Sequence, residues 1–290
     1  HLKQHHSSGV ALIIKGSRNM LFAAIVEHIQ VLIRDSGHPS MVYYLDEDDD
    51  EVEQALLVCR ERRPLGILFL GSNLELFQAR FAHIGVPCVL VTNSAAELGF
   101  PNLSSVSTDD AGAARQAVLR LMDLGHRRIG ILGGCTGMPN ASHTRFLGVR
   151  QAFEERGLSF DLDLQYEATH FSMAGGYEAM GRLLDRMRDL TAVFAMSDVQ
   201  AVGSIRALHD RGLRVPEDIS VIGFDGIELG GYVVPKLTTI RQDEHLLARR
   251  SVELLLQQIR AGRAPVHELV PYTFISGESV AAPREPARAG

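Results

Sequence analysis

The residue with the clearest chemical potential is Asp225, which directly follows a short apolar segment at 219–224. Such a segment is typical of a buried strand, and Gly226 behind it is typical of a turn. In an open parallel sheet, ligands bind beyond the carboxyl ends of the strands, so a carboxylate there can accept hydrogen bonds from a polar ligand. The alternative interpretation is that Asp225 only caps the turn.

A second candidate group is the guanidinium of Arg145, which follows the loop 136–144 and begins a predicted helix at 145–156. Its planar fork of donors suits neighbouring hydroxyl groups or a carboxylate. We expect Arg145 to point into a ligand site, and a salt bridge at the surface or at a hinge is the alternative. Together, the two residues indicate binding of a small polar molecule.

The motifs of catalysis and of metal binding are missing from the sequence. Glycines at 16 and at 133–137 match neither of the nucleotide-binding loop patterns, and there is no G-x-S-x-G segment. The twelve histidines show no H-E-x-x-H spacing. The three cysteines are far apart and are expected to be structural thiols: Cys59, Cys88 and Cys135. We therefore predict no enzyme, no metal and no cofactor.

Composition narrows the class of protein further. The chain has 290 residues, enough for two domains, and its net charge of −6 has the wrong sign for a self-sufficient nucleic-acid binder. No apolar run approaches the roughly 18 residues of a membrane span, and residues 1–9 lack the apolar core of a secretory signal. We expect a cytoplasmic protein that does not contact the membrane.

Strands and helices alternate along the chain in two successive series. The first series has strands at 10–14, 41–45, 67–70, 87–91 and 106–107, and helices at 21–33, 52–59 and 74–84. The six consecutive carboxylates at 46–51 are expected to form the solvated amino end of a helix, favoured by its dipole. Apolar strands alternating with helices indicate a parallel sheet that is covered on both faces.

The second series repeats the same order of elements. It has helices at 109–124, 145–156, 173–187 and 199–211, and strands at 129–132, 165–168, 192–196, 219–224 and 238–243. A long amphipathic helix at 244–259 and a single strand at 268–275 follow, and 281–290 is expected to be a frayed end. The fold class is therefore α/β, with two tandem Rossmann-like lobes.

Six segments in this order resemble the lactose-repressor family of bacterial transcriptional regulators. They are DDAGA (109–113) with GHRRI (125–129), RFLGV (145–149), FAMSDVQAVG (194–203), VPEDI (215–219), IGFD (222–225) and LTTIRQD (237–243). The segment at 145–149 departs from the family pattern, because Val149 stands where the family has Phe. The resemblance runs from about residue 10 to residue 280.

This resemblance implies a type I periplasmic-binding-protein-like fold with three crossings between the lobes. The N-terminal lobe is expected to hold 8–107 and 242–270, the C-terminal lobe 108–241 and 271–282, with tails at 1–7 and 283–290. It also implies a homodimer that binds a small effector between its lobes and controls operator DNA through a helix-turn-helix headpiece. We expect that headpiece to be absent here. The alternative is a periplasmic sugar-binding protein of a transport system.

The family resemblance also implies the residues of the effector site. Asp225 and Arg145 are expected to face each other across the opening between the lobes. The other members of the predicted site are Gln242, Ser197, Phe22, Phe171, Asn19 and Thr92. Several of these have ordinary alternatives, because Gln242 could satisfy backbone groups at a crossing and either Phe could fill a core. The neighbouring Asp198 is expected to cap the following helix.

The class of effector is left open by these residues. Thr92 stands where some sugar-responsive family members have Asp, which weakens any transfer of galactoside specificity. Arg18, in the polar loop after the first strand, could add a second cation and favour an anionic effector. A sugar, a sugar phosphate or a similar metabolite is therefore the predicted partner.

Overall fold

The computed structural model describes residues 9–137 and 140–284. The chain forms two compact units. Unit 1 is built mainly from the chain up to Thr108 together with Asp243–Pro271, and unit 2 from Asp109–Gly137, Ser142–Gln242 and the segment from Tyr272 onward. Most of the predicted tails at 1–7 and 283–290 lies outside the described residues. Among the helices described, none has the length and apolarity needed to cross a membrane.

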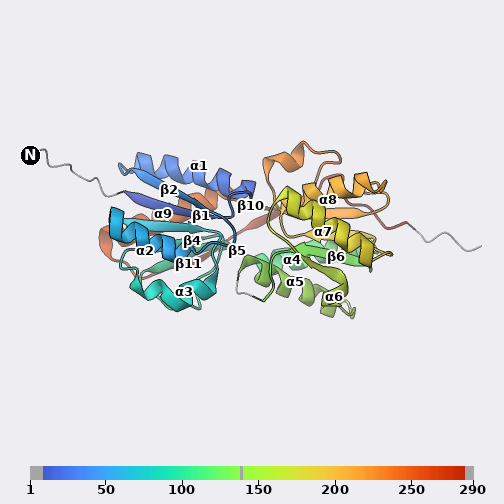
Figure 1. Ribbon diagram of the computed structural model, residues 1–290, viewed down its shortest axis with the longest axis horizontal. Helices are drawn as coiled ribbons and strands as arrows, with labels where there is room; N and C mark the ends of the chain where they lie inside the picture. Colours follow the sequence, from blue (N-terminus) through green and yellow to red (C-terminus); the bar gives the residue numbers. More distant parts are fainter. Residues whose placement is uncertain (1–8, 138–139, 285–290) are drawn as a thin grey trace, which may run out of the picture. The chain divides into compact units, whose positions relative to one another are not determined.

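Unit 1 alternates strands and helices and then receives a late helix and strand from near the end of the chain (Figure 1). Its elements are β1 (Val10–Lys15), α1 (Met20–Asp35), β2 (Ser40–Leu45), α2 (Glu51–Arg62), β3 (Gly66–Leu70), α3 (Leu74–Arg80), η1 (Phe81–His83), β4 (Cys88–Val91), β5 (Leu103–Thr108), α9 (Glu244–Ala261) and β11 (His267–Val270).

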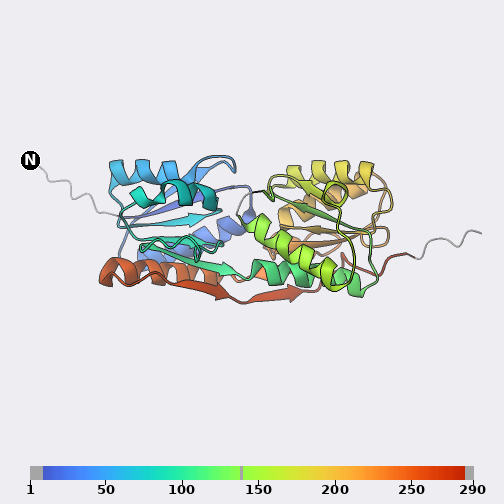
Figure 2. The same cartoon turned by 90° about the horizontal axis from the view of Figure 1, so that it is seen from below.

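The sheet of unit 1 is parallel throughout and has the order β11-β5-β4-β3-β1-β2. Helices α1 and α9 cover one face and α2 and α3 the other, as Figure 2 shows. Alternate strand residues reach each helical layer, so the central strands β1, β3 and β4 consist almost entirely of apolar residues. On the α2–α3 face the core includes Phe69, Phe77 and Phe81, all fully buried.

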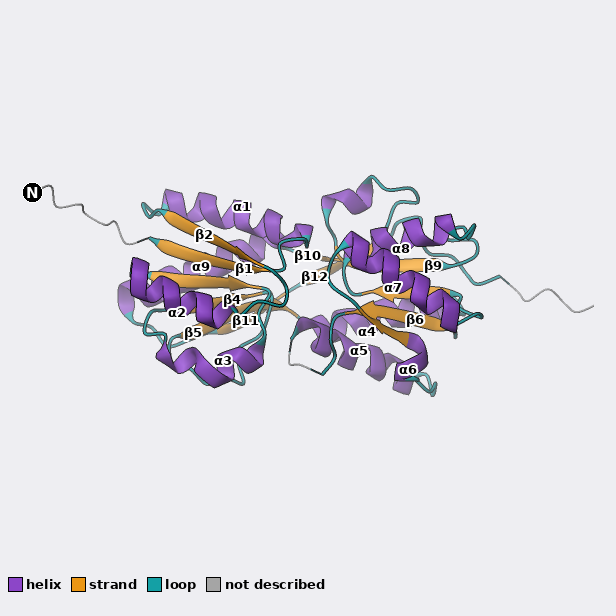
Figure 3. Cartoon of the chain, in the orientation of Figure 1, coloured by secondary structure: helices purple, strands orange, loops and turns teal. Residues whose placement is uncertain are grey.

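Unit 2 has the same alternation and gains its last strand after the chain has returned from unit 1 (Figure 3). Its elements are α4 (Asp110–Asp123), β6 (Ile129–Gly133), α5 (Ala141–Glu155), α6 (Leu162–Gln165), β7 (Tyr166–Ala168), α7 (Met173–Arg186), β8 (Ala192–Ala195), α8 (Asp198–Asp210), β9 (Ser220–Asp225), η2 (Glu228–Gly231), β10 (Thr238–Gln242) and β12 (Tyr272–Ile275).

The sheet of unit 2 has the order β12-β10-β9-β8-β6-β7. All of its strand pairs are parallel except β10 with β12, which are antiparallel. One core lies under α4 and α5 and contains Phe194 and Phe224; the other lies under α7 and α8 and contains Val193 and Val221. The predicted fold class, two tandem α/β units, is confirmed.

Short polar side chains start many of the helices immediately after a strand. Asn19 accepts a hydrogen bond from the backbone N–H of Leu21 at the start of α1, and Ser197 accepts one from Gln200 at the start of α8. Such caps satisfy N–H groups that the first turn of a helix leaves unpaired. They also keep the loops short, so polar residues collect where the strands end.

The predicted strand at 268–275 is wrong in one respect. It is two strands, β11 in the sheet of unit 1 and β12 in the sheet of unit 2, separated by Pro271. Proline has no N–H to donate to a sheet ladder, so a break at this residue is expected. The end predicted to fray from 281 is also held at its start, because the carbonyl of Ala281 accepts hydrogen bonds from His126 and Ser220.

Candidate functional site

Each unit has one edge where a ligand site is favoured by topology. In unit 2 the connection from β6 leads outward to β7, while β8 leads to β9 on the other side. In unit 1, β1 and β3 stand in the same relation. The loops that follow such neighbouring strands diverge, which leaves room for a ligand at the carboxyl edge of the sheet.

Arg145 lies on α5 and is 3% exposed. Its Nε donates to Oδ1 of Asp110 at 2.7 Å, and its Nη1 donates to the carbonyl of Met196, at the end of β8, at 2.5 Å. The guanidinium also stacks over the ring of Phe224, 3.8 Å from the ring centroid. The planar group is therefore fixed on three sides, which makes it a rigid, positively charged part of the β6–β8 edge.

Asp225 ends β9 and is fully buried, with a backbone φ of 116°. The side-chain amide of Gln242 donates to its Oδ1 at 2.9 Å, and Nη2 of Arg145 is 3.9 Å from the same oxygen. The structure thus brings three predicted residues together. We expected Asp225 and Arg145 on opposite sides of an interlobe opening; this is wrong, because both belong to unit 2.

Asp198 has a different role from the helix cap that we predicted. The cap of α8 is Ser197, whereas the Asp198 carboxylate accepts from the backbone N–H of Ile227 at 2.8 Å and from the hydroxyl of Thr239 at 2.6 Å. Gly223 makes room for it, because a Cβ there would lie 2.2 Å from Oδ1. Asp198 therefore holds the turn that follows Asp225 and so positions that carboxylate.

The electrostatics of this group reflect its burial. Burial raises the pKa of Asp198 well above its usual value, and repulsion from the carboxylate of Asp225 adds to the rise. Burial also raises the pKa of Asp110, although the adjacent Arg145 guanidinium opposes that shift. Removing a carboxylate from water disfavours its charged form unless a cation compensates. The site is thus an acidic cluster balanced by one guanidinium.

Two further predicted residues lie at the same edge of unit 2. Ser197 directly follows the β8 end that Arg145 contacts, and it is fully buried. Phe171 is half-buried against the core under α4 and α5. An atom of its ring lies 3.1 Å from the position that a Cβ would take at Gly134, just after β6. An aromatic ring at this place offers a flat apolar face to a ligand ring.

The remaining predicted residues lie in unit 1, at the ends of its strands. Asn19 is buried and occupied as the cap of α1, and Phe22 in the first turn of α1 packs near Gly16 and Gly71. Thr92 follows β4 with a backbone φ of 76° and is buried. All three lie at the carboxyl ends of unit 1 strands.

The sequence analysis missed a buried ion pair at this edge of unit 1. Nζ of Lys15, the last residue of β1, lies 2.9 Å from Oε2 of Glu51, and Oε1 of Glu51 accepts from the backbone N–H of Asn73 at 2.6 Å. We assigned Glu51 to a solvated helix end, but it is 1% exposed. Within the acidic run at 46–51, Asp50 caps the amino end of α2, as expected. The feature of the sequence that could have indicated this ion pair is a lysine at the end of an apolar strand.

Comparisons with known proteins agree with this geometry. A model of the periplasmic binding protein-like domain matches residues 118–280. The HTH-type transcriptional regulator MalR of Clostridium butyricum is 30% identical over 286 residues, which cover 96% of this chain and 83% of that protein. The HTH-type transcriptional repressor CytR of Escherichia coli is 33% identical over 261 residues, covering 89% of this chain and 75% of the repressor.

Solved structures of transcriptional regulators resemble this chain as well. A LacI family transcriptional regulator from Enterococcus faecium with bound ribose superposes with a TM-score of 0.82 at 26% sequence identity. The superposition covers 96% of this chain and 100% of that one. A shared fold does not by itself assign a ligand, so the assignment depends on the side chains described above.

Proposed function

This chain belongs to the lactose-repressor (LacI) family of transcriptional regulators, and on that premise we propose that it senses a small polar metabolite through the Asp225 cluster. The observation that carries the proposal is the convergence of Asp225, Arg145 and Gln242 at the carboxyl edge of one sheet. A carboxylate, a guanidinium and an amide provide the donors and acceptors that vicinal hydroxyl groups require.

We assign the ligand-contacting roles as follows. Asp225 accepts hydrogen bonds from ligand hydroxyls, Arg145 and Gln242 donate, and Phe171 offers an apolar face. Ser197 adds a hydroxyl in unit 2. Asn19, Phe22 and Thr92 in unit 1 stay predictions from the family resemblance. A neutral or phosphorylated sugar fits this set of groups, and the exposed Arg18 would favour the phosphorylated one.

The partners follow from the family. The relatives are named as transcriptional regulators, which favours a regulator over the periplasmic sugar-binding protein and over an enzyme. We propose a cytoplasmic homodimer in which operator DNA is bound by a helix-turn-helix domain of the kind that the relatives' names record. The two units described here carry the effector response.

A thermal-shift screen over sugars, sugar phosphates and purines tests the proposal. A ligand that binds only the folded protein raises its stability by about 2.7 kcal/mol at a concentration of 100 Kd. We expect one chemical class to raise the melting temperature, and we expect Asp225→Asn to lose that rise. Asp163→Asn, at an exposed position of the same unit, is the matched control and should keep it. Equal shifts in all three proteins would place the site elsewhere.

A further inference from the structure

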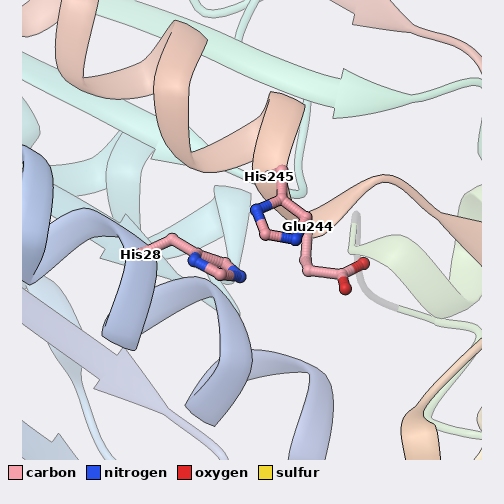
Figure 4. A group of neighbouring side chains, drawn as sticks. All are labelled: His28, Glu244 and His245. Carbon is pink, nitrogen blue, oxygen red and sulfur yellow. The ribbon is translucent and has the colours of Figure 1, made fainter.

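Three metal-ligating side chains that do not belong to the group around Asp225 meet on unit 1. His28 lies in the middle of α1, and Glu244 and His245 form the first turn of α9 (Figure 4). One ligand atom from each side chain lies within 4.8 Å of the other two. The two imidazole rings are in contact, with centroids 3.8 Å apart and planes tilted by 36°.

The three side chains are available to a ligand. His28 and Glu244 are half-buried and His245 is exposed. In the part of the chain that the structure describes, none of them has a hydrogen bond or ion pair with another side chain or with the backbone. Because the three side chains are accessible to solvent and make no such bond, a metal ion could bind them without first breaking a hydrogen bond within the protein.

We propose that His28, Glu244 and His245 bind a divalent transition-metal ion of the zinc type, with water completing the coordination. Imidazole nitrogen and carboxylate oxygen suit Zn²⁺ with bonds of about 2.0–2.2 Å, whereas Mg²⁺ and Ca²⁺ prefer oxygen alone. Tetrahedral ligands at that range are about 3.3–3.6 Å apart, so the three atoms need to approach by at most about 1.5 Å. Side-chain rotation at this accessible surface permits that movement.

The backbone under the site is rigid, which favours metal binding. The helices α1 and α9 pack together on the same face of the unit 1 sheet. Ile25 and Ile29, on either side of His28, are fully buried, and so are Leu247 and Ala248 after His245. Sites on packed helices lose little freedom when they bind a ligand. The positive amino end of the α9 dipole disfavours a nearby cation, and the carboxylate of Glu244 offsets that effect.

This inference departs from the sequence prediction of no metal site. His28 is separated from Glu244 and His245 by most of the chain, so no local spacing motif could show the group. The ion would join the start of α9 to α1. Since Asp243 is the first residue of the returning segment of unit 1, the metal would fix the point where the chain re-enters that unit.

Calorimetric titration with Zn²⁺ alone tests the proposal. His1, His5 and His6 would bind metal independently of the proposed site, so all three are replaced by glutamine in the reference protein. We expect one Zn²⁺ per chain and a higher melting temperature that EDTA reverses. In this background His28→Gln and His245→Gln should each weaken binding by about tenfold or more, and Glu244→Gln should weaken it as well.

His209→Gln is the control, because it removes an exposed imidazole from α8 in unit 2. It should leave zinc affinity and stoichiometry unchanged. The proposal is overturned if the reference protein binds no zinc, or if His28→Gln and His245→Gln bind it as tightly as the reference does. Melting temperatures without metal establish that the variants are folded, since these side chains contribute little to the core.

Discussion

Nη2 of Arg145 lies 3.9 Å from Oδ1 of Asp225, while Nε of the same arginine lies only 2.7 Å from Asp110. The guanidinium therefore forms its hydrogen-bonded ion pair with Asp110 and only a longer electrostatic contact with Asp225. Gln242 supplies the close hydrogen bond to Oδ1 of Asp225, at 2.9 Å. The pair with Asp110 thus fixes the guanidinium in place, whereas Asp225 is the carboxylate that we propose accepts hydrogen bonds from the effector.

Replacing Asp225 with Asn should weaken effector binding without harming the fold. Hydrogen bonds to a charged acceptor contribute about 1.5–3 kcal/mol, so affinity should fall roughly 10- to 150-fold. The melting temperature without ligand should stay the same or rise, because the repulsion between Asp225 and Asp198 is removed. Calorimetric titration with the best ligand of the screen, together with a thermal melt, measures both effects. Unchanged affinity would contradict the assigned role.

Replacing Arg145 should, by contrast, destabilise the protein itself. Arg145→Met leaves Asp110 buried without its cation, and breaking such a pair costs about 3–5 kcal/mol. The double variant with Asp110→Asn should recover part of the loss, because the Asp110 carboxylate is then no longer buried without its cation. The matched control is Arg128→Met, which breaks an exposed pair with Asp189 and should cost at most about 1 kcal/mol. Urea unfolding provides the measurement, and equal losses in both single variants would refute the prediction.

Asp198 should make stability depend on pH. Its pKa is raised well above 3.8, so the folded state prefers the protonated carboxyl. Its contribution to stability is therefore fully present below the unfolded pKa and is lost as pH rises through the folded pKa. Asp198→Asn cannot ionise. As pH rises from about 4, the unfolded-state value, the wild type should lose stability relative to this variant.

Melting temperatures of both proteins across that pH range measure the effect. Asp163→Asn, which removes an exposed carboxyl, should track the wild type throughout. A constant difference between the wild type and Asp198→Asn would show that Asp198 is ionised at every pH tested.

Replacing either of two glycines of unit 2 with alanine should change the stability of the protein, in opposite directions. A Cβ at Gly203 would lie 2.0 Å from the carbonyl oxygen of Met173, so Gly203→Ala must push α7 and α8 apart. Overpacking of this kind costs about 1–3 kcal/mol. A Cβ added at Gly181, in the interior of α7, would have its nearest neighbour at 3.6 Å. Gly181→Ala should therefore stabilise the helix by roughly 0.5–1 kcal/mol. Thermal melts that rank these two variants the other way would contradict the packing described here.

Local sequence predicted most of the fold for a clear physical reason. The central strands, which are buried on both faces, are largely apolar, and the helices between them repeat their apolar residues at helical spacing. These are local signals. The division of 268–275 at Pro271 was missed, because the choice between one strand and two depends on which sheet each half joins.

The candidate site was predicted in part. The family motifs place Asp225, Gln242 and Arg145 at strand and helix ends, and the structure brings these three together. The partners Asp110 and Asp198 were not recognised, because a carboxylate's role depends on what surrounds it after folding. Glu51 shows the same limit. It belongs to an acidic run that looks solvated, yet it is buried in an ion pair with Lys15 at the end of β1.

The backbone of Asp225, with its φ of 116°, has a consequence for how such regulators diverge. A side chain in this conformation costs about 1–3 kcal/mol that glycine would not incur. A lineage that no longer responds to its metabolite would gain stability by exchanging the aspartate for glycine, and selection would have little reason to restore it. On the role that we propose for Asp225, a glycine at this position would mark a regulator that no longer responds to a small molecule.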